Sequence, residues 1–238
     1  MREKPYLSLM GTLLWAVFTH PEIAYHVSFL CQFMHDPSIA AWDAGLGVLA
    51  YLSGARKNGI TFDGTKSHVV VFTDSSWGQT PFPYGGYVIF FAGAAISFSA
   101  RKLKIAPQSS AEAESAVYAS AAKDLQFVLN VLGADGLNHR VCLPVTIFCD
   151  NQAAVANVVN IGVTARTRHY ENWITFGREQ YLNRISEPKW IGTLEQVADI
   201  FTKALDKTSF LKFRALLLNI ESELVTTSMR EKVYGPHE

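Results

Sequence analysis

The sequence lacks an excess of charge of either sign. Its 238 residues contain 21 Lys and Arg against 21 Asp and Glu, so the formal net charge is zero with neutral histidines. This balance excludes a protein-wide positive field that attracts nucleic acids, and any nucleic-acid surface would have to be a local patch. With 49% hydrophobic and 18% charged residues, the composition is typical of a packed globular protein.

Cysteines and long apolar runs are also few. Cys31, Cys142 and Cys149 have no spacing typical of a metal site and cannot all pair within one chain, which indicates structural thiols in a reducing compartment. The most apolar stretch, residues 7–18, is too short to span a bilayer, and the first residues match no standard signal peptide. We expect a soluble, intracellular protein with no membrane partner.

The pattern of residue types along the chain changes near residue 60. Upstream, helical patterns are separated by Pro21 and Pro37, and turn residues at 54–67 mark a boundary. Downstream, β-branched and aromatic runs alternate with helical patterns. The predicted strands are residues 69–73, 86–91, 94–99, 144–149 and 187–191, and the predicted helices are 109–132, 151–160, 168–182 and 194–205.

The order of these elements predicts an α/β fold with a mixed five-stranded sheet. Three strands come first, then a helix, a strand, helices, a strand and a final helix. The second and third strands should form a hairpin, because Gly93 alone marks the turn between them. We divide the chain into a helical segment at 1–58, an α/β domain at 66–220 and a C-terminal tail at 221–238.

Two aspartates directly follow predicted strands. Asp74 ends the run VVVFT, and Asp150 ends the run PVTIFC. Each has a simple structural explanation, since aspartate is common in turns and at helix N-termini. However, side chains converge to form sites at the carboxyl ends of strands in open α/β sheets. The pair therefore indicates a site at one edge of the sheet.

The long helix that follows the hairpin carries two glutamates. Glu112 and Glu114 are two residues apart and therefore lie about 200° apart around the helix axis. Ser109 and Glu112 fit a capping box, which gives Glu112 a structural role. Glu114 instead begins the apolar stripe that must cover the sheet, although an acid near the positive end of the helix dipole would also explain it.

Asp199 is a fourth acid, on the predicted helix at 194–205, where Thr193 and Gln196 fit a second capping box. A solvated helix face would also explain it. Four acids at one site would repel one another unless cations neutralised them, and oxygen ligands alone select Mg²⁺ or Mn²⁺ over zinc. Two such ions, roughly 3.5–4 Å apart, would catalyse phosphodiester cleavage.

Several short motifs resemble the ribonuclease H region of copia-type retrotransposon Pol polyproteins, together with the segment that joins it to the reverse transcriptase. They occur in the correct order between Tyr6 and about Leu218. The similar segments are THPEIAYHVS for TRPDIAYAVS, AYLSGA for RYLKGT, TDSSWG for DADW, SSAEAES for SSTEAEY, CDNQAA for the same letters, RTRHY for RTKHI, and ADIFTKAL for ADILTKAL.

The resemblance implies a ribonuclease H fold with an N-terminal segment, residues 1–58, like the reverse transcriptase connection. It implies a nuclease that cuts the RNA strand of RNA–DNA hybrids with two Mg²⁺ or Mn²⁺ ions, with a reverse transcriptase polymerase domain as a possible partner, in cytoplasmic retroelement particles or the nucleus. The family's catalytic and metal-binding acids carry over onto Asp74, Glu114, Asp150 and Asp199. The candidate substrate-binding residues are Ser109, Asn151, Gln152, Arg166, Arg168 and His169, with Arg178 and Lys203 as further cations for phosphates.

The sequence departs from the family pattern at the rim of the predicted site. Ser76 replaces the second acid of DADW, and Lys189 and Trp190 stand where some ribonucleases H have a histidine. His169 either takes over the role of that histidine, which assists proton transfer or product release, or is instead a core or substrate-contacting residue. No adjacent aspartate pair of the polymerase kind occurs, so the chain is not expected to polymerise by itself.

Two alternatives to the nuclease remain open at this point. One is a catalytically idle, co-opted copy that binds hybrid nucleic acid or a protein partner. The other is a transposase or integrase on the same fold, which the position of Glu114 on the first long helix disfavours.

Overall fold

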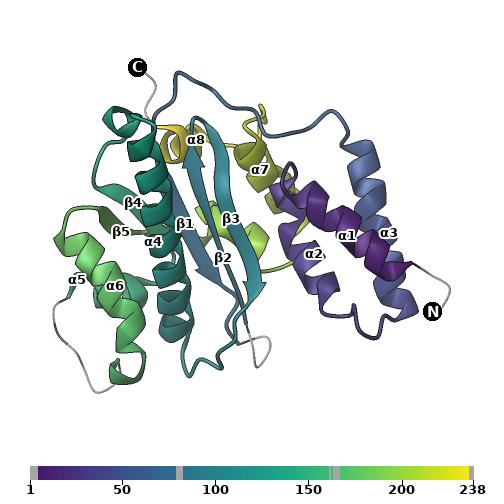
Figure 1. Cartoon of the computed structure of the whole chain (residues 1–238), viewed down its shortest axis with the longest axis horizontal. Helices are drawn as coiled ribbons and strands as arrows, with labels where there is room; N and C mark the ends of the chain where they lie inside the picture. The colour runs from purple at the N-terminus through teal and green to yellow at the C-terminus, as the bar shows by residue number, and fades with distance from the viewer. Residues whose placement is uncertain (1–4, 79–82, 161, 163–166, 236–238) are drawn as a thin grey trace.

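The computed structural model describes residues 5–78, 83–160, 162 and 167–235, and a five-stranded sheet forms its centre (Figure 1). The strands lie in the order β3-β2-β1-β4-β5. The first three are antiparallel neighbours, whereas β4 runs parallel to both β1 and β5. The predicted mixed sheet is confirmed. Its strands are β1 (Val70–Ser75), β2 (Tyr84–Phe91), β3 (Ala94–Lys102), β4 (Val145–Cys149) and β5 (Ser186–Trp190).

The helices predicted up to residue 182 are present, with shifts of a few residues at their ends, whereas the last two helices were not predicted. Three lie before the sheet, one follows the hairpin, two lie between β4 and β5, and two come last. They are α1 (Tyr6–Val17), α2 (Ala24–Cys31), α3 (Ile39–Gly54), α4 (Ser110–Ala134), α5 (Gln152–Val159), α6 (Glu171–Leu182), α7 (Lys207–Leu218) and α8 (Thr227–Tyr234). Among the described residues, no helix combines the length and hydrophobicity needed to cross a membrane.

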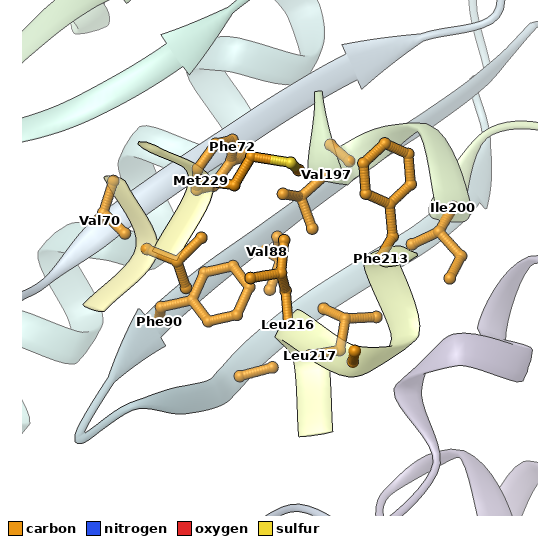
Figure 2. Close-up of a cluster of buried hydrophobic side chains, with 14 of the residues drawn as sticks. Val70, Phe72, Val88, Phe90, Val197, Ile200, Phe213, Leu216, Leu217 and Met229 are labelled. Carbon is orange, nitrogen blue, oxygen red and sulfur yellow. The ribbon is translucent and has the colours of Figure 1, made fainter. Parts of the chain in front are cut away.

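The sheet separates two apolar cores, because successive residues of a strand point to opposite faces. In β1, Val71 joins the cluster under α4, and Phe72 joins the cluster under α7 and α8. Figure 2 shows the second cluster, in which Phe213 of α7 and Met229 of α8 pack with side chains of β1 and β2. Since helices cover both faces, polar groups of the central strands are accessible only at the strand ends.

The first three helices have an apolar cluster of their own. Leu13 of α1 and Val27 of α2 are fully buried in it, and the Tyr6 hydroxyl donates to the backbone oxygen of Leu30 at 2.8 Å. These helices lie beside the β3 edge of the sheet (Figure 1). The separate cluster is the basis on which we propose residues 1–58 as a unit distinct from 66–220.

The expected C-terminal tail contains an ordered helix. Within residues 221–238, α8 begins after Thr226, whose hydroxyl accepts a hydrogen bond from the Met229 N–H at 3.3 Å. Met229 and Val233 are buried against the sheet. The segment therefore contributes to the same core as α7.

The predicted amphipathic helix at 194–205 is wrong. Two short 3-10 segments, η4 (Thr193–Glu195) and η5 (Val197–Phe201), occupy this stretch. The Gln196 side chain accepts from the Ala198 N–H at 3.3 Å and donates to the backbone oxygen of Thr73 at 2.9 Å. This bond to β1 holds the chain against the sheet, where all five residues of η5 are buried, so a helix with one solvated face cannot form.

Candidate metal centre

Four carboxylates from four elements meet at the carboxyl ends of β1 and β4. Oxygens of Asp74, Asp150 and Asp199 lie within 4.8 Å of one another. A second group within the same limit contains Glu114, the Cys149 thiol and Asp150. Because the two groups share Asp150, the structure brings together all four predicted acids.

Asp74 lies inside β1, so the prediction that it follows the strand is wrong. The antiparallel pairing of β1 with β2 continues through the pair Asp74–Gly86 to one pair beyond, which includes Gly85. Side chains at these glycines would collide with the layers on either face. A Cβ atom on Gly86 would lie 2.5 Å from Cβ of Phe201 in η5, and one on Gly85 would lie 2.6 Å from Cγ2 of Val117 in α4. The glycines therefore let α4 and η5 approach the sheet closely enough for their acids to reach β1.

Glu114 is the glutamate of α4 that reaches the cluster. It is 2% exposed, and its Oε1 accepts hydrogen bonds from both the N–H and the hydroxyl of Ser75, each at 2.9 Å. Its Oε2 lies 3.6 Å from Sγ of Cys149, at the end of β4. Glu114 thus connects the ends of β1 and β4.

Glu112 is held at the start of α4. Its N–H donates to the Ser109 hydroxyl at 3.1 Å, so Ser109 caps the helix as predicted. The reciprocal bond of the capping box is shifted by one residue, since the Glu112 carboxylate accepts from the N–H of Gln108 at 2.7 Å. The same carboxylate oxygen lies 3.2 Å from Nε2 of His169, which is exposed and not a core residue.

Asp150 does not cap α5, although N-capping was its simple explanation. Asn151 is the cap, since its side-chain oxygen accepts from the Ala154 N–H at 3.0 Å. The Asp150 carboxylate is therefore available to the cluster. Its Oδ2 accepts from the Thr193 hydroxyl at 3.2 Å, and its backbone oxygen accepts from the Trp190 indole N–H at 3.1 Å.

Asp199 faces the other acids from η5. Its Oδ2 lies 2.9 Å from Nζ of Lys203, one helical turn later, whereas its Oδ1 is buried without a hydrogen-bond partner. The hydroxyl of Thr202, between them, donates to Oδ2 of Asp74. Lys203, which we predicted to contact phosphates, thus forms an ion pair with Asp199.

Burial and mutual repulsion raise the pKa of three of these acids. Burial, followed by the charge of Asp74, raises the pKa of Asp199 to about 7, although Lys203 opposes the shift. Burial and the charges of Asp74 and Asp150 raise the pKa of Glu114 well above its usual value. Burial and Asp74 also raise the pKa of Asp150. Ionised carboxylates this close together repel one another, so they need a cation to compensate their charge.

The donor set fits a hard divalent cation. Carboxylate oxygens are the ligands that Mg²⁺ and Mn²⁺ prefer, and one group of three consists of carboxylates alone. The buried Oδ1 of Asp199 has no partner within the described protein, as expected of an atom that binds an ion. The residues present therefore fit the metal that the fold family implies.

The predicted substrate-binding residues differ in their exposure and in their hydrogen bonds to the protein. Asn151 donates from its amide to the Ser110 hydroxyl at 2.7 Å besides capping α5, so both ends of its side chain have protein partners. Gln152 and Arg168 are exposed, whereas Arg178 donates to the backbone oxygen of Asn157 at 2.8 Å. Arg166 lies outside the described residues.

Sequence reasoning missed the polar side chains around the acids. Ser75, Thr193 and Thr202 each donate a hydrogen bond to one of the carboxylates. Two of them flank the acids in sequence, but hydroxyl side chains next to an acid are common and carry no signal by themselves. Cys149, interpreted as structural, is fully buried with its sulfur facing Glu114.

Similar sequences include the Pol polyproteins of transposons. The retrovirus-related Pol polyprotein from transposon RE1 of Arabidopsis thaliana is 31% identical over 212 residues, which cover 87% of this chain and 14% of that protein. The corresponding polyprotein from transposon TNT 1-94 of Nicotiana tabacum is 29% identical over 217 residues, 88% of this chain and 16% of that protein. The chain thus spans about a seventh of the length of these relatives. No protein-family model matches the sequence.

Among solved structures, LC11-RNase H1 in complex with RNA/DNA hybrid is similar with a TM-score of 0.43 and 18% identity, over 56% of this chain and 93% of that one. The transposon relatives confirm the predicted resemblance. The mixed five-stranded sheet and the hairpin of β2 and β3 are those predicted from the sequence. The chain is therefore a homologue of one segment of the retrovirus-related Pol polyproteins of transposons, and the part of it that forms the five-stranded sheet has a ribonuclease H-like fold.

Proposed function

We propose that the chain is a metal-dependent endoribonuclease that cleaves the RNA strand of RNA–DNA hybrids during reverse transcription. The observation that carries this proposal is the convergence of Asp74, Glu114, Asp150 and Asp199 at one edge of the sheet. Relatives that are Pol polyproteins support a role next to a polymerase, and one similar ribonuclease H was solved with an RNA/DNA hybrid. A reverse transcriptase polymerase domain is the proposed protein partner.

The four acids would hold Mg²⁺ or Mn²⁺, and we propose two ions. When bound, these cations supply charge stabilisation for the reacting phosphate and acidify a water molecule that attacks it. The charge of Asp74 acts on each of the other three acids, so Asp74 lies at the centre of the set that would hold the ions. Because the pKa of Asp199 is raised to about 7, this carboxyl group would lose its proton when an ion is bound near neutral pH.

The surrounding residues would position the acids and the substrate. Hydrogen bonds from Ser75 fix the Glu114 carboxylate, and the Thr202 hydroxyl fixes that of Asp74, so little rearrangement is needed when an ion binds. The Lys203 ammonium supplies a positive charge beside the cluster; burial lowers its pKa, but the neighbouring acids outweigh this and raise it. Lys203 therefore stays protonated and could contact a phosphate oxygen.

The test is a hybrid-cleavage assay with the purified chain. We expect nicks in the RNA strand of a labelled RNA–DNA hybrid with Mg²⁺ or Mn²⁺, none with EDTA, and none in matched double-stranded DNA. Asp74→Asn should abolish cleavage while the circular dichroism spectrum is unchanged. Cleavage that survives EDTA would overturn the metal-dependent mechanism, and metal-dependent binding without cleavage would identify the chain as an idle copy.

A further inference from the structure

An exposed tryptophan lies against one of the four acids without a role in the mechanism above. Trp190 is the last residue of β5 and is paired with Cys149, the residue before Asp150. Its indole N–H donates to the Asp150 backbone oxygen at 3.1 Å, which fixes the ring beside the metal centre.

The ring adds an apolar surface to a site otherwise dominated by charge. Trp190 is 53% exposed although its single polar atom is satisfied, so the part that faces solvent is hydrocarbon. An indole face can bind a nucleotide through stacking and apolar packing, which the negative charges of carboxylates and phosphates do not weaken. A fixed ring also loses little conformational entropy on binding.

The geometry of a duplex substrate determines which part of the nucleotide such a ring can contact. Base faces in a hybrid are already stacked on their neighbours, whereas the wide, shallow minor groove of an A-like helix exposes the sugars. We propose that Trp190 is a substrate-contacting residue, whose indole face packs against a sugar of the strand held at the acids. This inference rests on the proposed function and deepens it, since it assigns an apolar contact to the β5 side of the substrate.

A purely positioning role for Trp190 predicts a different outcome. If its hydrogen bond to Asp150 were what mattered, phenylalanine would fail to replace it, and the loss would appear in kcat. If the ring contacts the substrate, phenylalanine keeps the apolar plane, and the loss in alanine appears in KM and in hybrid affinity. The two variants therefore separate the roles.

The experiment measures hybrid binding and cleavage in parallel. Binding of a fluorescent RNA–DNA hybrid would be followed by anisotropy in an Asp74→Asn background, and KM and kcat would be measured without that substitution. We expect Trp190→Ala to weaken binding and to raise KM by about 5- to 30-fold with less than a twofold change in kcat, and Trp190→Phe to cost less than about threefold. Trp15→Ala is the matched control, because Trp15 is 78% exposed on α1, away from β5 (Figure 1).

Each outcome decides between the two proposals. Unchanged hybrid affinity in Trp190→Ala, with cleavage intact, would overturn the tryptophan contact and leave the nuclease standing. An equal loss in the alanine and phenylalanine variants, confined to kcat, would also overturn it. If the unmodified chain neither binds nor cuts hybrid, the nuclease fails and the tryptophan contact fails with it.

Discussion

Buried acids occur in two regions of this molecule, and they are surrounded differently. Glu22, between α1 and α2, is 0% exposed, and its Oε1 accepts from the Tyr51 hydroxyl and lies near the His20 ring, each at 3.0 Å. Arg214 of α7 in turn lies 3.5 Å from the Tyr51 hydroxyl. Burial and the Glu22 charge raise the pKa of that hydroxyl to about 12, which keeps it a donor. Hydrogen-bond donors thus surround Oε1 of Glu22, whereas its Oε2 is buried without a partner among the described residues.

At the metal centre the nearest neighbours of the acids are other acids. Asp74, Asp150 and Asp199 lie within 4.8 Å of one another, and only Lys203 among the described residues forms an ion pair with any of them. A single buried acid with donors around it can be stabilised by the protein alone. Several buried acids together need a ligand. The comparison teaches that a structural and a functional carboxylate differ in their neighbours and not in their burial.

A matched pair of amide substitutions tests the difference between these two kinds of acid most directly. Asp150→Asn and Glu22→Gln each exchange one carboxylate oxygen for an amide group. We expect the first to lower single-turnover hybrid cleavage in Mg²⁺ by a factor of about 100 or more, because Asp150 is one of the three carboxylates that would hold an ion together. The second should change the rate less than about twofold. Similar losses in both variants would contradict the division between structural and functional acids.

Complete removal of the Glu22 side chain should lower the stability of the fold and leave cleavage unchanged. Glu22→Ala leaves the Tyr51 hydroxyl and the His20 ring without their acceptor in a buried place. We expect a loss of about 1–3 kcal/mol in the free energy of unfolding, measured by urea denaturation. Cleavage per folded molecule should remain at the level of the unmodified chain. A stable variant with reduced cleavage would show that Glu22 acts on the site.

The pH dependence of stability gives a smaller effect with a definite sign. Because the pKa of Asp199 is raised to about 7 in the folded chain, the folded state binds this proton more tightly than the unfolded state between roughly pH 4 and 7. In EDTA, the stabilisation of the folded state by this bound proton is complete at the acid end of that pH range and is lost as the pH rises through it. Glu114 and Asp150 shift in the same direction.

The measurement is thermal unfolding in EDTA at several pH values, with Asp199→Asn as the control. We expect the unmodified chain to lose on the order of 1 kcal/mol relative to Asp199→Asn between pH 5 and pH 7.5. Added Mg²⁺ should restore most of this difference in the unmodified chain and little in the variant. Parallel pH profiles for the two chains would contradict the raised pKa of Asp199.

Much of the fold could be predicted from local patterns. The runs that became β2 and β4 were evident from strand-forming residues, and Ser109 marked the start of α4 correctly. The helix α7 was missed although a signal was present: Asp206 accepts from the N–H groups of Thr208 and Ser209, which is an N-cap typical of a helix start.

The sequence by itself determined which acids belong to the site. Asp74 and Asp150 were marked by the ends of apolar strand runs, Glu114 by its place on the apolar stripe of its helix, and Asp199 by its motif. Local patterns suffice for the first three, because they depend on residues only a few positions apart, whereas Asp199 required the family motif, since the helix predicted around it was wrong.

Only the tertiary structure decided how those acids are held. Gln196 bonds to Thr73, 123 residues earlier, and so η5 replaces a helix. Thr202 bonds to Asp74 across 128 residues. Such contacts depend on how distant segments pack against the two faces of one sheet, and no local pattern in the sequence encodes that packing.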